Sequence, residues 1–483
     1  MQNLYKNRLH FLIIFICVFF GIFLRIYNIN YDNLWYDEIL SFWIADPEIT
    51  IKESLKRHQS IEQIPFLFNL ILKFLFKIFS YEPSIGRYLS LIFNILSIIF
   101  IVKILRQLKN NNSHIFGLFL LSANIYLIAY SQELRVYSMM LFLCSLYLWL
   151  FIHILKKNRK SKKVNLKLSF FFILSQILMI LSHPFCLIVF FSTSIFSLLN
   201  YLKFKTNIKV VNYSILITVL FSIVYFFIYI NTIDTYPGWI IQPDIKFYTN
   251  FYFSKYFGSR LVGLVYLLIF IYLLFSFRKK LMHEFFYLNI FLIIFFLSYF
   301  LPMLFGYLFR PIIFPRYIIF VLIPIVVLLS FLIFEIDKKF KKNILIILIV
   351  ILTIGNLYTE STIQQFIKER TYHKTNFSSV LNEINNSKNK LYTLDLKFSN
   401  KRKTPSINAI TNYINKLSST MNININYVEK NDFINSEINE IWTICILGIM
   451  KDRCSFLDSN FNSEIIDEKY FSDINLRKIR KIN

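Results

Sequence analysis

Long apolar runs separated by short polar loops fill the first 358 residues of this 483-residue chain. Many of them approach the roughly 20 residues that an α-helix needs to cross a bilayer. We therefore predict an α-helical polytopic membrane protein. Its eleven expected spans lie at residues 9–27, 86–105, 114–130, 134–155, 168–182, 184–202, 210–230, 260–277, 284–301, 317–334 and 343–358.

One further apolar stretch, residues 63–80, is not counted as a span. A crossing there would place the largest lysine cluster of the chain on the outer face, against the positive-inside rule. Lys73 and Lys77 are also four residues apart, as on one face of a helix that lies along a membrane surface. We therefore expect juxtamembrane helices at 48–80, within an outer loop at 28–85.

The charge distribution predicts the orientation. The chain has 53 Lys and Arg against 28 Asp and Glu, a net charge of +25, and the basic residues gather in alternate loops. A cytoplasmic N-terminus, with Lys6 and Arg8, puts these loops inside, together with only Glu284, Glu335 and Asp337 among the acids before residue 359. The excess charge is thus an orientation signal in a plasma (inner) membrane protein, and it indicates no nucleic-acid partner.

Composition changes after residue 358. Residues 359–483 are rich in Asn, Ser and charged side chains, and their periodicity mixes two kinds of element. Together they predict a small soluble α/β domain outside the membrane, following a transmembrane domain at 1–358. The expected helices are 378–384 and 406–417, and the expected strands are 390–396 and 440–447.

The five cysteines indicate no metal centre. Cys17, Cys144 and Cys186 lie in spans as small apolar residues. Cys445 and Cys454 are both in the external domain and could form a disulfide, which their spacing alone does not decide. The chain has no Walker loop, glycine-rich nucleotide loop or nucleophile elbow. An enzyme of this kind would not draw on a cytosolic nucleotide donor.

The acidic pair Asp37 and Glu38 directly follows the first span, in the segment Leu34-Trp-Tyr-Asp-Glu38. Carboxylates at the edge of a bilayer are costly to hold near hydrocarbon, which makes them candidates for function. The structural alternative is that Asp37 is the N-cap of a juxtamembrane helix that begins near Glu38.

Other polar and aromatic side chains stand at the outer ends of spans. In the expected topology they face the same side as the acidic pair, and cations together with carboxylates suit a phosphate-bearing lipid. The alternatives are interfacial anchoring, pairing with a neighbouring acid, or capping of a loop. These residues are Arg87, Arg135, Tyr137, His183, Arg316 and Tyr317.

Two further features could contribute to a sugar site. Trp35 and Trp239 could line it, although aromatic residues also form belts at membrane surfaces. The loop at 231–259, which contains Tyr236-Pro-Gly-Trp239, could be a lid on the acceptor side.

The order of the short motifs resembles the GT-C glycosyltransferases, closest to the protein O-mannosyltransferase and lipid A aminoarabinose transferase branches. The resemblance covers about residues 1–358. Where that family often carries His-Pro-Pro, this chain has Glu62-Gln-Ile-Pro65, with His58 seven residues before the proline. The matching motifs are Leu34-Trp-Tyr-Asp-Glu38, Gly86-Arg-Tyr88, Gln132-Glu-Leu-Arg-Val-Tyr137, Ser182-His-Pro184 and Pro315-Arg-Tyr317.

The resemblance implies that a sugar passes from a polyprenyl-phosphate donor to an extracytoplasmic lipid, glycan or protein, usually with inversion. Asp37 would then be the base, and Glu38 would position Asp37, the acceptor or a metal. The cations Arg135, Arg316 and His183 would bind the donor phosphate. Tyr137, Tyr317 and Arg87 would complete the donor site. No cofactor is required, and dependence on a divalent metal is left open.

Two other classes of protein compete with this interpretation. A transporter or flippase of lipid-linked sugars would be expected to show internal repeats and broken helices at the midplane, which the sequence does not suggest. A sensor or scaffold would need far fewer than eleven spans to anchor it.

Overall fold

The computed structural model describes residues 2–62, 64–109, 111–159, 164–204, 209–230, 240–359, 374–396, 400–446 and 463–482. The chain forms two compact units, and each takes up several separate stretches of sequence. The first comprises Met1–Tyr27, Ile64–Phe68 and Arg87–Glu369, and the second comprises Asn28–Gln63, Asn69–Gly86 and Arg370–Asn483.

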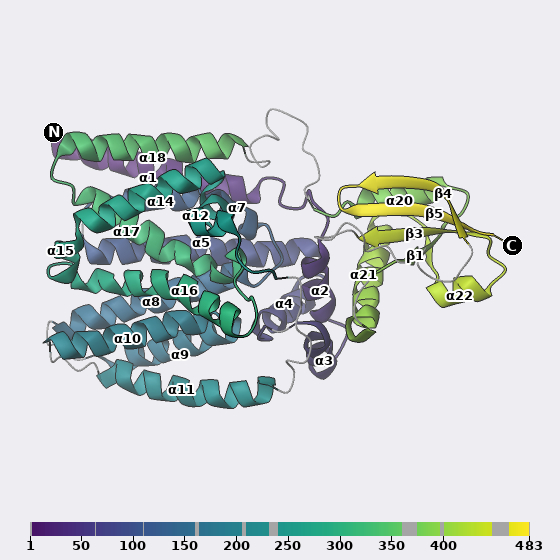
Figure 1. The fold of residues 1–483 in the computed structure, drawn as a ribbon, viewed down its shortest axis with the longest axis horizontal. Helices are drawn as coiled ribbons and strands as arrows, with labels where there is room; N and C mark the ends of the chain where they lie inside the picture. Colours follow the sequence, from purple (N-terminus) through teal and green to yellow (C-terminus); the bar gives the residue numbers. More distant parts are fainter. Residues whose placement is uncertain are drawn as a thin grey trace. The chain divides into compact units, whose positions relative to one another are not determined.

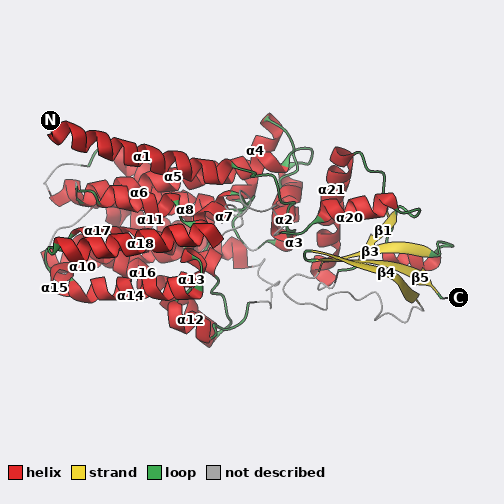
Figure 2. Ribbon diagram, turned by 90° about the horizontal axis from the view of Figure 1, so that it is seen from above, coloured by secondary structure: helices red, strands yellow, loops and turns green. Residues whose placement is uncertain are grey.

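The first unit is helical, and its long helices run side by side in both views of the chain (Figures 1 and 2). Apolar side chains cover these helices almost all round, as expected of a bundle in lipid. All the described helices of this unit, long and short, are α1 (Gln2–Ile26), α5 (Pro83–Leu108), α6 (Ser113–Ser122), α7 (Ile125–Ser131), α8 (Tyr137–Arg159), α9 (Leu166–Ser182), α10 (Cys186–Phe204), α11 (Lys209–Ile230), α12 (Ile245–Asn250), α13 (Phe253–Phe257), α14 (Arg260–Ser276), α15 (Arg278–Met282), η1 (Phe286–Leu288), α16 (Asn289–Leu308), η2 (Pro315–Val321), α17 (Leu322–Phe334) and α18 (Lys339–Thr359).

Seven helical segments of the described chain are long and apolar enough to cross a membrane. α6 and α7 make an eighth candidate as a pair that bends by 56°, and α9, α11 and α14 are shorter apolar helices. A helix thus lies on each of the eleven expected spans, and the multi-pass character is confirmed. The number of crossings stays a prediction.

A buried arginine satisfies the backbone at the bend between α6 and α7. Asn124 begins α7, where its Oδ1 accepts from the backbone N–H of Leu127 at 2.9 Å. The bend leaves the last carbonyls of α6 without helical donors. Arg25, fully buried at the end of α1, donates to the carbonyl oxygens of Leu121 and Ser122 at 2.9 and 2.8 Å.

The same network joins α1, α5 and α7. Arg25 Nε donates to Asn94 Oδ1 on α5 at 2.9 Å, and Asn94 Nδ2 donates to the carbonyl of Leu127 at 3.1 Å. Gln132, just after α7, donates from Nε2 to the carbonyl of Arg25 at 3.1 Å. The end of α1 and the end of α7 therefore satisfy each other's polar groups inside an apolar bundle.

The second unit combines the loop after α1 with the C-terminal region. Helices α2 and α3 both pack against α21. The segment expected as a separate outer loop therefore belongs to the same compact body as the C-terminal sheet. The elements of this unit are α2 (Tyr36–Ile44), α3 (Ile51–Ile61), most of α4 (Leu67–Ile78), α20 (Phe377–Asn386), β1 (Leu391–Leu394), α21 (Asn400–Met421), β2 (Asn426–Tyr427), α22 (Lys430–Asn435), β3 (Glu440–Ile446), β4 (Ser463–Phe471) and β5 (Ile474–Lys481).

The strands form one mixed sheet in the order β2-β1-β3-β5-β4. β1 is parallel to β2 and β3, whereas β5 is antiparallel to β3 and β4. The central strand β3 is buried from Ile441 to Cys445, as in a sheet that is covered on both faces. The expected helices and strands of this region are all present, with bounds shifted by a few residues.

The hairpin of β4 and β5 was not expected from the sequence. Three of its cross-strand pairs join opposite charges, and two of these form ion pairs, Glu468 with Arg477 at 2.7 Å and Glu464 with Arg480 at 3.3 Å. Such pairs support a hairpin without an apolar alternation that a sequence pattern would reveal. Cys445, on β3, is disulfide-bonded. Cys454 lies outside the described residues, so its identity as the partner stays a prediction.

The juxtamembrane helices expected at 48–80 are α3 and α4, but the two lysines of α4 have different surroundings. Lys77 is exposed, whereas Lys73 is buried. Lys73 Nζ donates to the carbonyl of Asp46 and, at 2.7 Å, to that of Ile49. It therefore secures the turn after α2 instead of extending toward lipid headgroups.

The Arg25 network yields a stability prediction. We expect Arg25→Met to lower the free energy of unfolding by about 3 kcal/mol, because it removes the buried guanidinium donors to the carbonyls of Leu121 and Ser122. Denaturant unfolding of the purified protein in detergent measures this change. The matched control is Arg106→Met, which removes an exposed arginine near the end of α5 and should have little effect. Equal stability of the two variants would contradict the role of Arg25.

Candidate functional site

The acidic pair lies in the first turn of α2, in the second unit. Trp35 is the N-cap residue, so Asp37 and Glu38 occupy the second and third positions of the helix. The alternative in which Asp37 is the N-cap is therefore wrong. Glu38 Oε2 accepts from the backbone N–H of Trp35 at 3.4 Å and so contributes to the cap itself. Acids in a first turn also complement the helix dipole.

The two carboxylates have different surroundings. The Glu38 side chain has no exposed surface and pairs with Lys374 Nζ at 2.9 Å. Asp37 is half-buried. A buried carboxylate held by a cation cannot readily accept a proton from a substrate, whereas a half-buried one is accessible. The local structure therefore separates a supporting acid from a candidate base.

The end of α2 is held by an aromatic stack. Phe42 stacks on Tyr81, with ring centroids 4.0 Å apart and planes 3° apart. Tyr81 Oη also donates to the carbonyl of Phe42 at 3.1 Å. Burial raises the pKa of the Tyr81 phenol, so the hydroxyl keeps its proton for this hydrogen bond.

In the first unit, two arginines approach one aromatic ring. The guanidinium carbon of Arg135 lies 5.9 Å from the ring centroid of Tyr137, and that of Arg316 lies 5.7 Å from the same centroid. All three residues are buried or nearly so. Contacts at this distance are typical of cation–π attraction. The ring of Tyr137 thus brings together two cations that are 181 positions apart in the sequence.

His183 and Tyr317 complete this cation–aromatic cluster, which we define as Arg135, Tyr137, His183, Arg316 and Tyr317. The His183 ring centroid lies 5.3 Å from that of Tyr317 and 6.2 Å from that of Tyr137. The rings of Tyr137 and Tyr317 are 6.3 Å apart. Five of the eight predicted site residues therefore meet in one place.

Local chain geometry directs these side chains. α7 ends at Ser131, and a tight turn, in which Arg135 N–H donates to the carbonyl of Glu133 at 2.8 Å, places Arg135 just before α8. His183 ends α9 ahead of Pro184, and its Nδ1 accepts from the N–H of Phe185 at 3.3 Å. His183 therefore does cap the loop through Nδ1, as the structural alternative proposed. Its ring also packs near the rings of Tyr137 and Tyr317.

Arg316 and Arg87 are also placed by helix starts. Pro315 opens η2, where proline suits the first helical position, and Arg316 follows it. Arg87 is buried near the start of α5, four residues after Pro83. One turn later, Ser90 Oγ donates to the carbonyl of Arg135 at 3.3 Å, so the start of α5 lies beside the turn that carries Arg135.

The aromatic part of the cluster extends further than the motifs predicted. The Tyr130 ring lies 5.4 Å from that of Tyr137, and the Tyr126 ring lies 4.6 Å from that of Tyr130. The ring centroid of Phe314 lies 4.9 Å from the guanidinium carbon of Arg316. Tyr126 and Tyr130 are four residues apart on α7, and this helical spacing before Arg135 was the signal that could have indicated them. Trp239 and the core of the expected lid lie outside the described residues.

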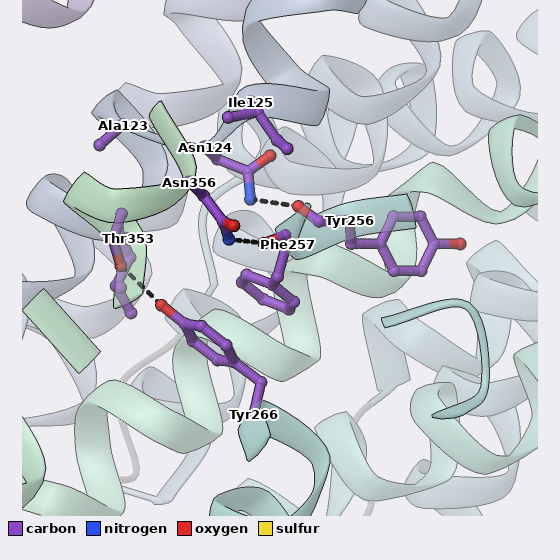
Figure 3. A pocket seen from close by; sticks show the side chains of 9 residues that line it. Ala123, Asn124, Ile125, Tyr256, Phe257, Tyr266, Thr353 and Asn356 are labelled. Atoms are coloured by element: carbon purple, nitrogen blue, oxygen red, sulfur yellow. Dashed lines mark hydrogen bonds between the residues drawn. The ribbon is translucent and has the colours of Figure 1, made fainter. Parts of the chain in front are cut away.

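A small pocket lies elsewhere in the first unit (Figure 3). Tyr266 Oη lies 2.6 Å from Thr353 Oγ1, and Asn124 Nδ2 donates to the carbonyl of Tyr256 at 2.9 Å. These polar groups satisfy one another where α7, α13, α14 and α18 meet, and none of the predicted site residues lines the pocket. It is a packing junction of the bundle.

No metal centre emerges from the described residues. Among them, the His, Cys, Asp and Glu side chains form no group of three or more that could hold an ion. His58, seven residues before Pro65, is buried, and its Nδ1 lies 3.1 Å from Asn69 Nδ2. That contact links α3 to α4.

The cluster yields a prediction about Tyr137. We expect Tyr137→Leu to lower the free energy of unfolding by about 2 kcal/mol, because the ring contacts two guanidinium groups and three other rings. Tyr137→Phe keeps the ring and should cost less. Thermal unfolding in detergent compares them, with exposed Tyr88→Leu as the control. Equal losses for the leucine and phenylalanine variants would contradict a role for the ring.

Comparisons with known proteins identify the fold. No protein-family model matches the chain, and no curated protein matches its sequence. The crystal structure of ArnT from Cupriavidus metallidurans in the apo state matches with a TM-score of 0.59 and 10% identity over 98% of each chain. The same protein bound to undecaprenyl phosphate matches with a TM-score of 0.55 and 9% identity over 97% of each chain. The chain therefore has the fold of ArnT, in agreement with the fold that the resemblance of its motifs implied.

Proposed function

We propose that this protein transfers a sugar from a polyprenyl-phosphate donor to an acceptor outside the cytoplasm. The observation that carries the proposal is the cation–aromatic cluster, in which Arg135 and Arg316 contact one buried ring. Guanidinium groups bind phosphate oxygens through paired, charge-assisted hydrogen bonds. ArnT, whose fold this chain shares, has been solved with undecaprenyl phosphate bound.

The cluster suits a lipid donor better than a soluble one. Its residues come from the ends of apolar helices, which would place the phosphate at the level of lipid headgroups with the polyprenyl chain in hydrocarbon. His183 adds a further donor to the phosphate. Tyr317, which is half-buried, would offer an aromatic face to the sugar ring, and the buried ring of Tyr137 would hold the two arginines in place.

The reaction would be a single displacement with inversion. The acceptor oxygen or nitrogen forms a bond to the anomeric carbon as the bond from that carbon to the phosphate oxygen breaks. Asp37 takes the proton of the acceptor, and the electron pair leaves with polyprenyl phosphate. Arg135 and Arg316 neutralise that leaving group, so it needs no proton.

Glu38 would support this chemistry without taking the proton. Its burial and its pairing with Lys374 make it a positioning residue for Asp37. The displacement requires no organic cofactor, and a divalent metal, if one takes part, would interact with the acceptor side. Assays with EDTA and with added Mg²⁺ or Mn²⁺ test that point.

We place the protein in the plasma (inner) membrane with its N-terminus in the cytoplasm and the C-terminal region outside. The basic loops support this orientation by the positive-inside rule. The domain boundary proposed from the sequence remains at residue 358, with the loop at 28–85 contributing the catalytic acid.

The proposed function predicts a large effect of substituting the base. Asp37→Asn should lower the rate of sugar transfer by about 10²–10⁴-fold, the usual contribution of a positioned base, while donor binding is retained. Release of polyprenyl phosphate from radiolabelled undecaprenyl-phosphate sugars, in nanodiscs with envelope extract, measures transfer. The matched control is Glu53→Gln, an exposed acid in the first turn of α3. Binding without turnover by the wild type across a full sugar panel would favour a transporter of lipid-linked sugars instead.

The proposed function also predicts which residues bind the donor phosphate. Arg135→Met and Arg316→Met should each weaken binding of undecaprenyl phosphate by about 10–100-fold, the loss expected for one charge-assisted hydrogen-bonding group. Equilibrium binding of fluorescent undecaprenyl phosphate in detergent gives the Kd. Arg260→Met, at an exposed helix start, is the control. Unchanged affinity in both cluster variants would remove the cluster as the donor site.

A further inference from the structure

The segment around Asp37 is bound on both sides to the C-terminal region. Asn33 Oδ1 accepts from the N–H of Ser378 at 2.8 Å, and Asn33 Nδ2 donates to Ser378 Oγ at 2.9 Å. The backbone N–H of Leu34 donates to Tyr413 Oη at 3.0 Å. The start of the acidic segment therefore rests on α20 and α21, more than 340 residues away in sequence.

The helical side of the segment is held in the same way. Tyr36 Oη lies 2.7 Å from Ser406 Oγ on α21. Glu38 Oε2 accepts from Lys374 Nζ at 2.9 Å. Four residues within a span of six, on both sides of Asp37, are thus fixed by residues that the chain supplies after its last membrane helix.

The ion pair is the strongest of these contacts. Glu38 has no exposed side-chain surface, and Lys374 is only 19% exposed, so solvent screens their attraction weakly. Consecutive side chains of an α-helix point about 100° apart. A fixed Glu38 therefore also fixes the direction in which Asp37 leaves the helix.

We propose that Lys374 is a positioning residue for sugar transfer: through Glu38 it fixes the first turn of α2 and thereby aims Asp37. The inference rests on the proposed function, in which Asp37 is the base. It makes the C-terminal region a working part of the catalytic loop. A merely adhesive contact between two segments would need no charged pair buried beside the base.

The test compares turnover with stability in the wild type and four variants. Lys374→Met should lower kcat by about 10–100-fold, because a base displaced by about 1 Å loses that much, with the donor KM unchanged. Lys374→Arg, which keeps the charge, should retain most of kcat. The control Lys416→Met removes the exposed pair with Glu82, also between the C-terminal region and the loop, and should leave kcat unchanged.

The double variant Glu38→Gln/Lys374→Met separates positioning from stability. It leaves no unpaired buried charge, so its Tm should recover toward the wild-type value. Its kcat should stay low, because the first turn of α2 is no longer fixed. Recovery of kcat together with Tm would overturn the proposal, and so would a wild-type kcat in Lys374→Met.

Amide hydrogen exchange keeps this inference distinct from the proposed function. Exchange across residues 33–44 should be faster in Lys374→Met than in the wild type or in Lys416→Met. If the wild type transfers no sugar, the proposed function fails, whereas the exchange result still reports whether Lys374 fixes α2. Unchanged exchange in Lys374→Met would overturn the positioning role by itself.

Discussion

The bundle depends on how one buried guanidinium is satisfied. Arg25 lies at the end of α1, beside the bend between α6 and α7. It donates hydrogen bonds to carbonyl oxygens whose burial in an apolar interior would otherwise cost free energy. Because the bend is stabilised, α7 can end early and the chain can turn at Gln132 toward Arg135. The position of a proposed substrate-binding cation thus follows from the hydrogen bonding of a structural one.

The two kinds of charge in the proposed reaction are supported by different means. Arg135 and Arg316 lie among aromatic rings at the ends of apolar helices, where the rings attract cations without neutralising them. Glu38 is buried and paired with Lys374, whereas Asp37 is half-buried. In the proposed reaction, the two arginines would bind the phosphate and Asp37 would be the carboxylate that takes the proton.

Sequence reasoning was strongest where a single physical rule dominates. Apolar length predicts a helix at every expected span, and the order of short polar motifs indicated the residues that meet around Tyr137. Sequence reasoning was weakest where a residue's role depends on a partner far away in the sequence. The hairpin that carries Glu468 and Arg477 lacks the alternation of apolar and polar residues by which a strand is predicted. Lys73 was predicted to lie at the membrane surface, but its ammonium group binds backbone carbonyls. The same applies to Glu38, whose partner is 336 residues away.

The division of the second unit along the chain has a consequence for biosynthesis. A ribosome makes the segment with Asp37 early, but Lys374, Ser378 and Tyr413 emerge only after all the intervening helices. Until then the acidic segment lacks the contacts that order it. Under the proposed function, a truncated or half-made chain would carry every residue of the cation–aromatic cluster but would transfer sugar slowly, because Asp37 is not yet held in place. Late completion of the segment around Asp37 would therefore limit premature use of the donor.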